Sequence, residues 1–275
     1  MTMGAPLLCF IDGIGVLGPG LGNWAQAVDV LAGRQPYQPA PTELAPPAIL
    51  PPAERRRSGT AVRLALGIGQ QAVAAAGMEA AGLPTVFTSS SADGHNFHAI
   101  CEALAQPDPL MSPTRFHNSV HNVAAGYWSI ATRAMRPANV LSALDASFGA
   151  GLLEAAAQVS ADREPCLLIA YDSDYPEPLR TLRPIAAPFG VALLLSPEAS
   201  ERSLARIEVA LAHAAATPMD DAALETLRRS VPTARALPLL HAVAMQSASS
   251  VVIDYLEDLQ LQVAVHPQAR PGNGG

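Results

Sequence analysis

The chain has 275 residues, of which 49% are hydrophobic and only 15% are charged, and its 24 acidic and 17 basic side chains give a formal net charge of −7. This apolar content is enough for a folded core and excludes a disordered chain. The acidic balance argues against a nucleic-acid binder, because phosphate contacts need a basic surface. All basic residues other than histidine are arginine, so Schiff-base lysines and a lysine-containing phosphate loop are excluded.

In chain order, short apolar strands alternate with amphipathic helices, which predicts an α/β protein with a covered sheet. The first half is expected to hold a strand at 7–14, a helix at 23–31, a helix at 55–76, a strand at 83–89, a helix at 96–105 and a helical stretch from 112 towards 135. The second half is expected to hold strands at 139–144, 165–171, 190–195, 203–211, 250–255 and 261–266, and helices at 148–160, 220–230 and 237–246.

We expect one domain over residues 1–266, with a core over 1–196 and a smaller remainder over 197–266. The final residues, 267–275, are predicted to be disordered. The proline-rich segment 35–53 cannot form a regular element, so it is either a loop that wraps another element or a mobile flap.

The compartment is predicted from cysteine usage and from the absence of targeting patterns. No apolar run reaches the roughly 18 residues of a membrane span, and the first residues lack the basic start of a signal peptide. The odd number of cysteines, Cys9, Cys101 and Cys166, in apolar contexts indicates buried thiols in a reducing cytoplasm. The positive mean hydropathy of +0.21 suggests that a partner subunit covers some apolar surface.

Two short patterns are weak indications of ligand binding. Gly13, Gly15 and Gly18 match a GxGxxG fingerprint, but a proline-rich loop stands where the acidic second strand is needed, so a structural turn is favoured. Residues 89–91 are three serines after a strand, but no GxSxG pattern surrounds them. They are expected to satisfy backbone groups of a loop.

Four histidines lie close together in the sequence, as His95 and His98 followed by His117 and His121. The second pair has the i, i+4 spacing that can place two imidazoles on one side of a metal ion. No HExxH pattern accompanies the pair, so we expect no metal site and instead favour imidazoles that line a cleft or hydrogen-bond within it.

The most informative segment runs from Leu141 to Ala157. A buried strand ends near Asp145, turns sharply and starts a helix of small residues, which is the shape that presents a nucleophile at a helix N-terminus. Phe148 stands at the tip of the turn, and its side chain has neither a lone pair nor an ionisable proton. The alternative interpretation is a plain strand–turn–helix unit with Phe148 in the core.

Three stretches carry a resemblance to a known family. They are FIDGIGVLGPGLGNWAQAVDVLAGRQPY, SPTRFHNSVHNVAAGYWSIAT and SALDASFGAGLLEAA, and they resemble β-ketoacyl synthases, in particular the chain-length-factor branch of ketosynthase-like N-terminal domain proteins in aryl polyene pathways. The resemblance implies a thiolase-like α/β fold, mainly the N-terminal half of a ketosynthase. It places Asp145 on the Asp of the family's Asp-x-Ala-Cys motif and Phe148 on the catalytic Cys.

The resemblance therefore implies a catalytically inactive subunit without cofactor or metal. The family's two histidine motifs for decarboxylation, an HGTGT-like motif and a Lys-containing GH segment, do not occur here. His213, His241 and His266 stand in poor contexts for either role, so we expect them on the surface or in packing. An acyl-enzyme cannot form without the nucleophile.

The resemblance also implies a partner. Family members dimerise through the strand before the elbow, and the helix before that strand sets the length of the partner's acyl tunnel. We therefore expect a heterodimer with an active β-ketoacyl synthase, served indirectly by an acyl carrier protein. The expected dimer strand is Asn139, Val140, Leu141, Ser142, Ala143 and Leu144, and the expected tunnel residues are Phe116, His117, Val120, Ala124, Tyr127 and Trp128.

Two alternatives remain open from the residues. One is an acyltransferase-type enzyme with another nucleophile, such as Ser147, whose side chain should point away from the elbow tip. The other is a homodimeric scaffold that binds an acyl chain or a carrier protein. The basic run 55–57 could meet an acidic carrier protein, although such a run at a helix start is commonly solvated surface.

Overall fold

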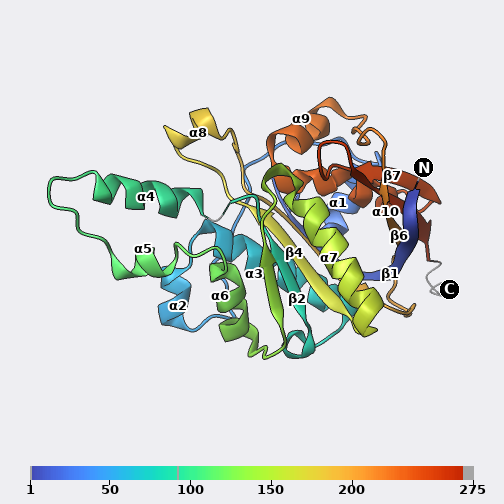
Figure 1. Ribbon diagram of the computed structural model, residues 1–275, viewed down its shortest axis with the longest axis horizontal. Coiled ribbons are helices and arrows are strands. Elements are labelled where there is room, and N and C mark those ends of the chain that lie inside the picture. The colour runs from blue at the N-terminus through green and yellow to red at the C-terminus, as the bar shows by residue number, and fades with distance from the viewer. Residues whose placement is uncertain (1, 92, 269–275) are drawn as a thin grey trace.

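The computed structural model describes residues 2–91 and 93–268, so residues 269–275 of the predicted disordered tail lie outside the described residues. Pro267 corrects that prediction, because it is the last residue of a strand. The described strands form one eight-stranded mixed sheet with the order β3-β2-β4-β5-β1-β6-β8-β7 (Figure 1). The strands are β1 (Thr2–Leu17), β2 (Thr85–Thr88), β3 (Ala138–Leu141), β4 (Cys166–Asp172), β5 (Phe189–Ser196), β6 (Ala205–Ala212), β7 (Ser249–Ile253) and β8 (Gln260–Pro267).

The helices follow the predicted alternation with the strands, and three short 3-10 turns connect them. The α-helices are α1 (Trp24–Leu31), α2 (Pro52–Arg57), α3 (Thr60–Ala76), α4 (Gly94–Leu104), α5 (Pro113–His117), α6 (Val123–Thr132), α7 (Ser147–Asp162), α8 (Leu179–Leu182), α9 (Ala222–Ser230) and α10 (Leu237–Ala244). The 3-10 turns are η1 (Ala80–Gly82), η2 (Leu144–Ala146) and η3 (Pro232–Ala236).

Strand β1 joins the two halves of the sheet. Its second half, from Phe10, pairs antiparallel with β5, and its first half, up to Ile11, pairs antiparallel with β6. Strand β2 pairs parallel with both β3 and β4. The chain after Ser196 therefore extends the sheet with β6, β8 and β7.

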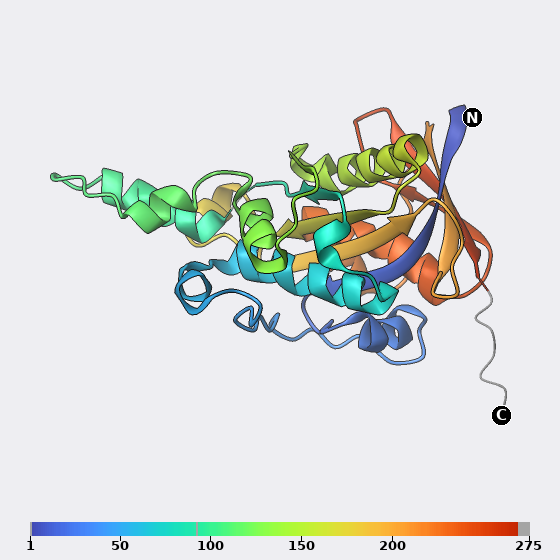
Figure 2. The same cartoon turned by 90° about the horizontal axis from the view of Figure 1, so that it is seen from below.

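Helices cover both faces of the sheet, as predicted. Figure 2 shows α7 and α3 on opposite sides of the strands. One core cluster holds Leu64 and Ile68 of α3 with Trp128 of α6, and the other holds Leu152 of α7 with Leu240 of α10. Because each strand of the β4–β5 pair is buried on both faces, these strands are apolar up to their last residues, Asp172 and Ser196.

The glycines near the N-terminus lie in a strand, which corrects the prediction of a turn at Gly13–Gly18. Strand β1 continues through Gly13 and Gly15 to Leu17, beyond the predicted end at Ile14. A Cβ atom on Gly13 would lie 2.1 Å from the Ala72 carbonyl oxygen, and one on Gly15 would lie 2.0 Å from the Ile68 carbonyl oxygen. These glycines therefore let α3 approach the sheet closely and do not form a phosphate-binding loop.

Two predicted helices are each split into two. The helix expected at 55–76 is divided by Ser58 and Gly59, where the Ser58 hydroxyl donates to the Arg55 carbonyl and ends α2. The helical stretch expected from 112 is divided between α5 and α6 at residues 118–122. Side-chain hydrogen bonds to nearby carbonyls favour such breaks over a continued helix.

The proline-rich segment wraps the body of the chain. The Gly20 N–H donates to the Ala40 carbonyl at 3.0 Å, and the Thr42 hydroxyl donates to the Pro188 carbonyl at 2.8 Å. Leu50 is buried in the α3 core cluster. Of the two interpretations of this segment, the structure supports the wrapping loop, although the predicted irregular segment ends early because α2 begins at Pro52.

Helices α4 and α5 form an arm that projects from the body in both views (Figures 1 and 2). Several large apolar side chains of the arm are exposed, and Cys101 of α4 is exposed as well, which corrects the prediction of three buried thiols. Cys9 and Cys166 are buried as predicted. The exposed apolar residues of the arm and the turn after it are Phe97, Leu104, Leu110, Phe116 and Val120.

Candidate functional site

The candidate site lies at the carboxyl ends of the three parallel strands β2, β3 and β4. In open α/β sheets this edge is the usual position of ligand and catalytic groups. Strand β2 ends at Thr88 and leads into the arm, β3 leads into the elbow, and β4 ends at Asp172. The predicted elbow therefore lies beside the loop of three serines that follows β2.

The backbone of the elbow is held by Ser147, the first residue of α7. The Ser147 hydroxyl accepts from the Ala143 N–H at 3.0 Å and donates to the Leu144 carbonyl at 2.7 Å. The Thr88 hydroxyl donates to the Ser147 carbonyl at 2.8 Å and ties the elbow to β2. Ser147 is completely buried, so its hydroxyl has a structural role at the turn and is not presented to a substrate.

Phe148 lies in the first turn of α7, and its side chain is only 1% exposed. It belongs to the core cluster that contains Leu152 and Ala155 of the same helix. Helix α7 packs closely here, because a Cβ atom on Gly151 would lie 2.6 Å from the Thr88 methyl group. The benzyl group therefore fills the space beside the elbow and offers no reactive atom.

None of the three cysteine thiols takes the place of a nucleophile at the elbow. Burial raises the pKa of Cys9 to about 12 and that of Cys166 to about 12. Both thiols are therefore protonated at neutral pH and are poor nucleophiles. The third, Cys101, lies on the exposed arm.

The Asp145 carboxylate at the elbow is held by two arginines. It forms an ion pair with Arg183, which follows α8, and a second one with Arg235 of η3 at 3.3 Å. Arg235 also donates to the Asp145 carbonyl at 2.9 Å. These contacts clamp the turn between two distant segments of the chain.

A second carboxylate, Asp172, is completely buried at the end of β4. It accepts from the N–H and the hydroxyl of Ser90 at 2.9 and 2.6 Å, and from the N–H and the hydroxyl of Thr233 at 2.8 and 2.6 Å. Burial raises the pKa of the Asp172 carboxyl, although these hydrogen bonds act in the opposite direction. The serine loop thus satisfies backbone groups, as predicted, because the Ser89 hydroxyl donates to the Ser91 carbonyl, and Ser90 in addition satisfies a buried carboxylate.

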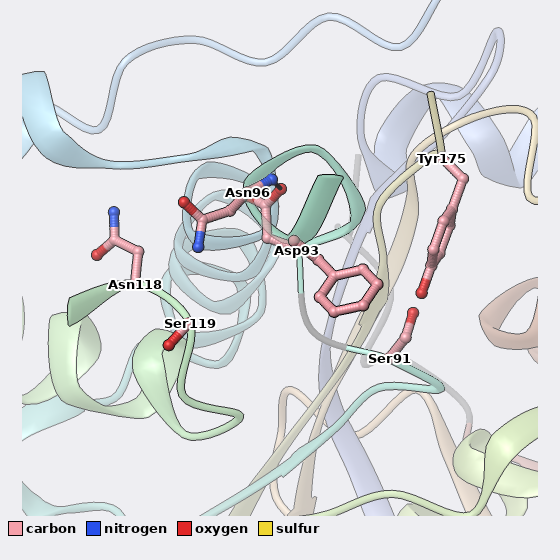
Figure 3. Close-up of a pocket in the computed structure, with 7 residues that line it drawn as sticks. Ser91, Asp93, Asn96, Asn118, Ser119 and Tyr175 are labelled. Atoms are coloured by element: carbon pink, nitrogen blue, oxygen red, sulfur yellow. Dashed lines mark hydrogen bonds between the residues drawn. The ribbon is translucent and has the colours of Figure 1, made fainter. Parts of the chain in front are cut away.

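A cavity of about 240 Å³ opens where the arm leaves the body. Figure 3 shows the hydroxyl groups of Ser91 and Tyr175 pointing toward each other on one side of it. Asn96 and Asn118 lie on the other side, and the Phe97 ring completes the lining. The cavity therefore combines an apolar surface with hydroxyl and amide groups.

The four histidines that are close together in the sequence contact different groups in the structure. His95 faces Asp174 at 3.0 Å, and His98 faces Glu102 at 3.3 Å. The His117 ring packs edge-on against Tyr127, and the His121 Nε2 atom lies 3.2 Å from the Leu141 carbonyl oxygen. Within residues 2–91 and 93–268, no three His, Cys, Asp or Glu side chains come together as a metal site would require.

The three remaining histidines also have protein contacts. His213 contacts the Asp258 carbonyl, and the His241 Nδ1 atom lies 2.6 Å from the Leu31 carbonyl oxygen. His266 lies 3.7 Å from Glu208. None of these three contacts involves Phe148 or the elbow.

The residues expected to line a partner's tunnel divide into two groups. Phe116 is 67% exposed and Val120 is 49% exposed, and His117 is exposed beside them. Ala124, Tyr127 and Trp128 are buried in this chain's own core. The first group is exposed to solvent, whereas the second packs in the core beneath α6.

The expected dimer strand is shorter and more open than predicted. Strand β3 ends at Leu141, and it is the last strand at its edge of the sheet. Asn139 is exposed, and Val140 and Leu141 are half-buried, so the strand is not covered on both faces within one chain. Ser142 and Ala143 form the turn, and Leu144 begins η2 with 70% of its side chain exposed.

Several residues of the site carried no local signal in the sequence. Arg183 and Arg235 are 38 and 90 residues from Asp145 along the chain, and Thr233 is 61 residues from Asp172. Only the fold brings them together. The polar Asp172 directly after an apolar strand is the one feature that could have indicated a buried carboxylate.

Comparison with solved structures gives the fold. One match is a chain of the complex between the ketosynthase ApeO and its chain length factor ApeC from Xenorhabdus doucetiae, with 22% identity, a TM-score of 0.72, and 94% of this chain and 99% of that chain covered. A chain of the ishigamide ketosynthase/chain length factor matches with 15% identity and a TM-score of 0.70 over 97% of this chain and 100% of that chain. A β-ketoacyl synthase from Burkholderia phymatum matches with 12% identity and a TM-score of 0.65 over 95% and 99%.

The chain therefore has the thiolase-like α/β fold of ketosynthases. The sequence model described as "Beta-ketoacyl synthase, N-terminal domain" matches residues 24–255, which is most of the chain. The chain thus belongs to the β-ketoacyl synthase N-terminal domain family, as the sequence resemblance predicts. A search of curated proteins found none that matches the sequence.

Proposed function

We propose that this chain is a non-catalytic, chain-length-factor-type subunit that pairs with an active β-ketoacyl synthase. The observation that carries the proposal is the buried Phe148 side chain in the first turn of α7, because the sequence resemblance aligns this residue with the family's nucleophile. Without a nucleophile at this position, the chain would keep the ketosynthase fold but could not form a covalent acyl intermediate.

The edge of the sheet supports pairing. Strand β3 has a neighbour on one side only, and an open strand edge is a template for a strand of another chain. The adjacent arm exposes Leu104, Leu110 and Phe116, which are costly in water and favourable in an interface. The proposed partner contacts are therefore β3, the elbow and the arm.

The proposed role in chain length rests on the exposed residues after α5. Phe116 and Val120 project from the arm and its following turn, where bulky side chains would shorten an apolar tunnel in the partner. The product is proposed to be a polyketide or fatty-acid-like chain, in particular a polyene. No helix of the described residues has the length and apolarity to span a membrane, and a cytoplasmic location remains a prediction.

Co-expression with an active β-ketoacyl synthase tests the pairing. We expect co-elution at a one-to-one ratio in size-exclusion chromatography. Phe116→Asp and Val120→Asp should abolish it, because they place charge in the interface. Leu256→Asp is the matched control, since Leu256 is 50% exposed in the turn between β7 and β8. A free chain in every fraction, or a homodimer that ignores the synthase, would contradict the proposal.

Product analysis and acyl trapping test which subunit affects the length of the product and which subunit carries the acyl group. Phe116→Ala should lengthen the product of the complex, whereas Tyr127→Ala should mainly lower stability because Tyr127 is buried. An activated acyl thioester should label the partner synthase and not this chain in mass spectrometry. Labelling of Ser147 or of any cysteine here would favour the enzyme alternative instead.

A further inference from the structure

We propose that the cleft at the root of the arm binds a phosphate ester that carries an apolar chain. This site is separate from the elbow and from the exposed tunnel residues. It is formed by the cavity of Figure 3 and by a second cavity of about 470 Å³. The two cavities share Asp93, Asn96 and Asn118 as lining residues, so they adjoin each other.

The second cavity is basic, although the whole chain is acidic. It is lined by Arg56 and Arg57 at the end of α2 and by Arg115 of α5, together with His95. Neither Arg56 nor Arg115 has an ion-pair partner within the described part of the chain. Guanidinium groups that converge on a cleft without carboxylate partners are suited to a phosphate group.

The carboxylates near the cleft cancel only part of this charge. Glu54 pairs with Arg57 at 3.1 Å, and Asp174 contacts His95, which is charged only when it is protonated. The buried Asp93 lines the cleft, and its Oδ1 atom accepts from the Asn96 N–H as the cap of α4. Because Asp93 offsets one of the two arginines that have no ion-pair partner, the lining keeps an excess of one positive charge.

Two asparagines hold the backbone at Arg57 and Arg115. The Asn96 side-chain amide donates to the Arg115 carbonyl at 2.9 Å, and the Asn118 side-chain amide donates to the Arg57 carbonyl at 2.8 Å. Both asparagines also line the cleft. The backbone positions of the basic residues are thus fixed before any ligand arrives, which lowers the cost of binding.

The inner cavity suits the apolar part of the ligand. The Phe97 ring lines it, and Ser91 and Tyr175 place their hydroxyl groups on the far side. The Ser91 hydroxyl oxygen is buried and has no hydrogen-bond partner among the described residues. An unpaired buried hydroxyl is costly, and an ester or hydroxyl oxygen of a ligand would satisfy it.

Titration of the full-length chain with octyl phosphate tests the proposal by calorimetry at low salt. We expect saturable binding about tenfold tighter than that of inorganic phosphate, because only the ester fills the inner cavity. Octanol and octyltrimethylammonium should not bind. If octyl phosphate bound no tighter than octanol or octyltrimethylammonium, the proposal would be overturned.

Matched variants locate the site. Arg56→Glu together with Arg115→Glu should weaken octyl phosphate binding about tenfold or more, and the milder Arg→Gln pair should weaken it less. Arg229→Glu together with Arg133→Glu, an equal charge change at two exposed arginines outside the cleft, should leave it unchanged. Circular dichroism checks that each variant is folded. Equal losses in the Arg229 and Arg133 control would overturn the proposal.

A final comparison distinguishes a soluble ester from a lipid headgroup, which present the same phosphate. We propose the soluble ester, because the cleft is a cavity and not a flat basic face. Sedimentation with phosphatidic acid vesicles should therefore leave the chain in the supernatant. Vesicle binding that is lost in the Arg56 and Arg115 variants would contradict the soluble ester. Because these measurements use the isolated chain, their failure leaves the proposed pairing untouched.

Discussion

The carboxylate of Asp172 accepts hydrogen bonds from both the N–H and the hydroxyl of Thr233, at 2.8 and 2.6 Å. Asp172 ends a strand of the core, whereas Thr233 lies in η3 of the C-terminal remainder. Both side chains are completely buried. This pair therefore anchors the remainder to the carboxyl end of the parallel strands, next to the elbow.

Loss of the Thr233 hydroxyl should destabilise the chain. Thr233→Val keeps the shape of the side chain but removes a donor to a buried carboxylate, so we expect the free energy of unfolding to fall by about 1.5–3 kcal/mol. Urea denaturation measures the change. Thr226→Val, which removes an exposed hydroxyl of α9, is the control and should change the stability by less than about 0.5 kcal/mol. Equal effects of the two variants would contradict this role.

The stability of the chain should depend on pH through Glu225. Its carboxylate accepts from Arg228 at 2.7 and 2.8 Å and from the Met219 N–H at 2.9 Å, and these contacts lower its pKa from 4.5 to about 2. A lowered pKa in the folded state gives stability that is present above pH 4.5 and is lost as the pH falls towards about 2.

Glu225→Gln should therefore cost about 1–2 kcal/mol at pH 7, a value reduced for partial exposure of the carboxylate. The difference from the unchanged chain should shrink as the pH falls below 4.5. Denaturant unfolding at several pH values measures it, with Glu257→Gln as an exposed control. A difference that is constant between pH 3 and 7 would refute the assignment.

Restoring a thiol at the elbow should not restore catalysis. Phe148→Cys replaces a buried ring by a smaller side chain, and we expect a loss of about 3 kcal/mol from the cavity that remains. The thiol would be buried as Cys9 is, so its pKa should also be raised and it should form no acyl adduct in mass spectrometry. Phe148→Leu serves as the control for packing. Acylation of the new thiol in the Phe148→Cys variant would show that the site retains activating groups.

Leu144 should affect stability and pairing in opposite directions. Its φ of 49° lies in the left-handed region, and its side chain is 70% exposed. Leu144→Gly removes the strain, so the isolated chain should gain about 0.5–1 kcal/mol, while the complex with a synthase should weaken because an apolar contact is lost. Arg163→Gly is the matched control.

Arg163 has a similar φ of 57° at the end of α7. Its replacement by glycine should stabilise the isolated chain in the same way but leave pairing unchanged. Thermal melts and co-elution measure the two effects. If Leu144→Gly strengthened the complex, the proposed contact at the elbow would be wrong.

The sequence predicts the local elements of the site well. The apolar runs before and after the elbow predict β3, α7 and β4. The small residues after Phe148 are visible in the sequence, and the structure shows that they allow α7 to pack closely on β2. The phenylalanine at position 148 is known from the sequence alone. These features depend on neighbouring residues, which is why a pattern of a few positions suffices.

Long-range contacts account for what the sequence does not predict. The extension of β1 through Gly13 and Gly15 depends on the approach of α3, and the exposure of β3 depends on its place at the edge of the sheet. The arginine cleft needs α2 and α5 to meet, although they are far apart along the chain. Such features follow from tertiary packing and leave little local trace.

The open edge at β3 has a consequence for the amount of this chain that the cell makes relative to its partner. A chain made in excess keeps an unpaired strand edge beside an arm of exposed apolar side chains, and such edges promote aggregation. Balanced synthesis of the two subunits would then protect the chain, and an orphan copy would be a substrate for chaperones and proteases.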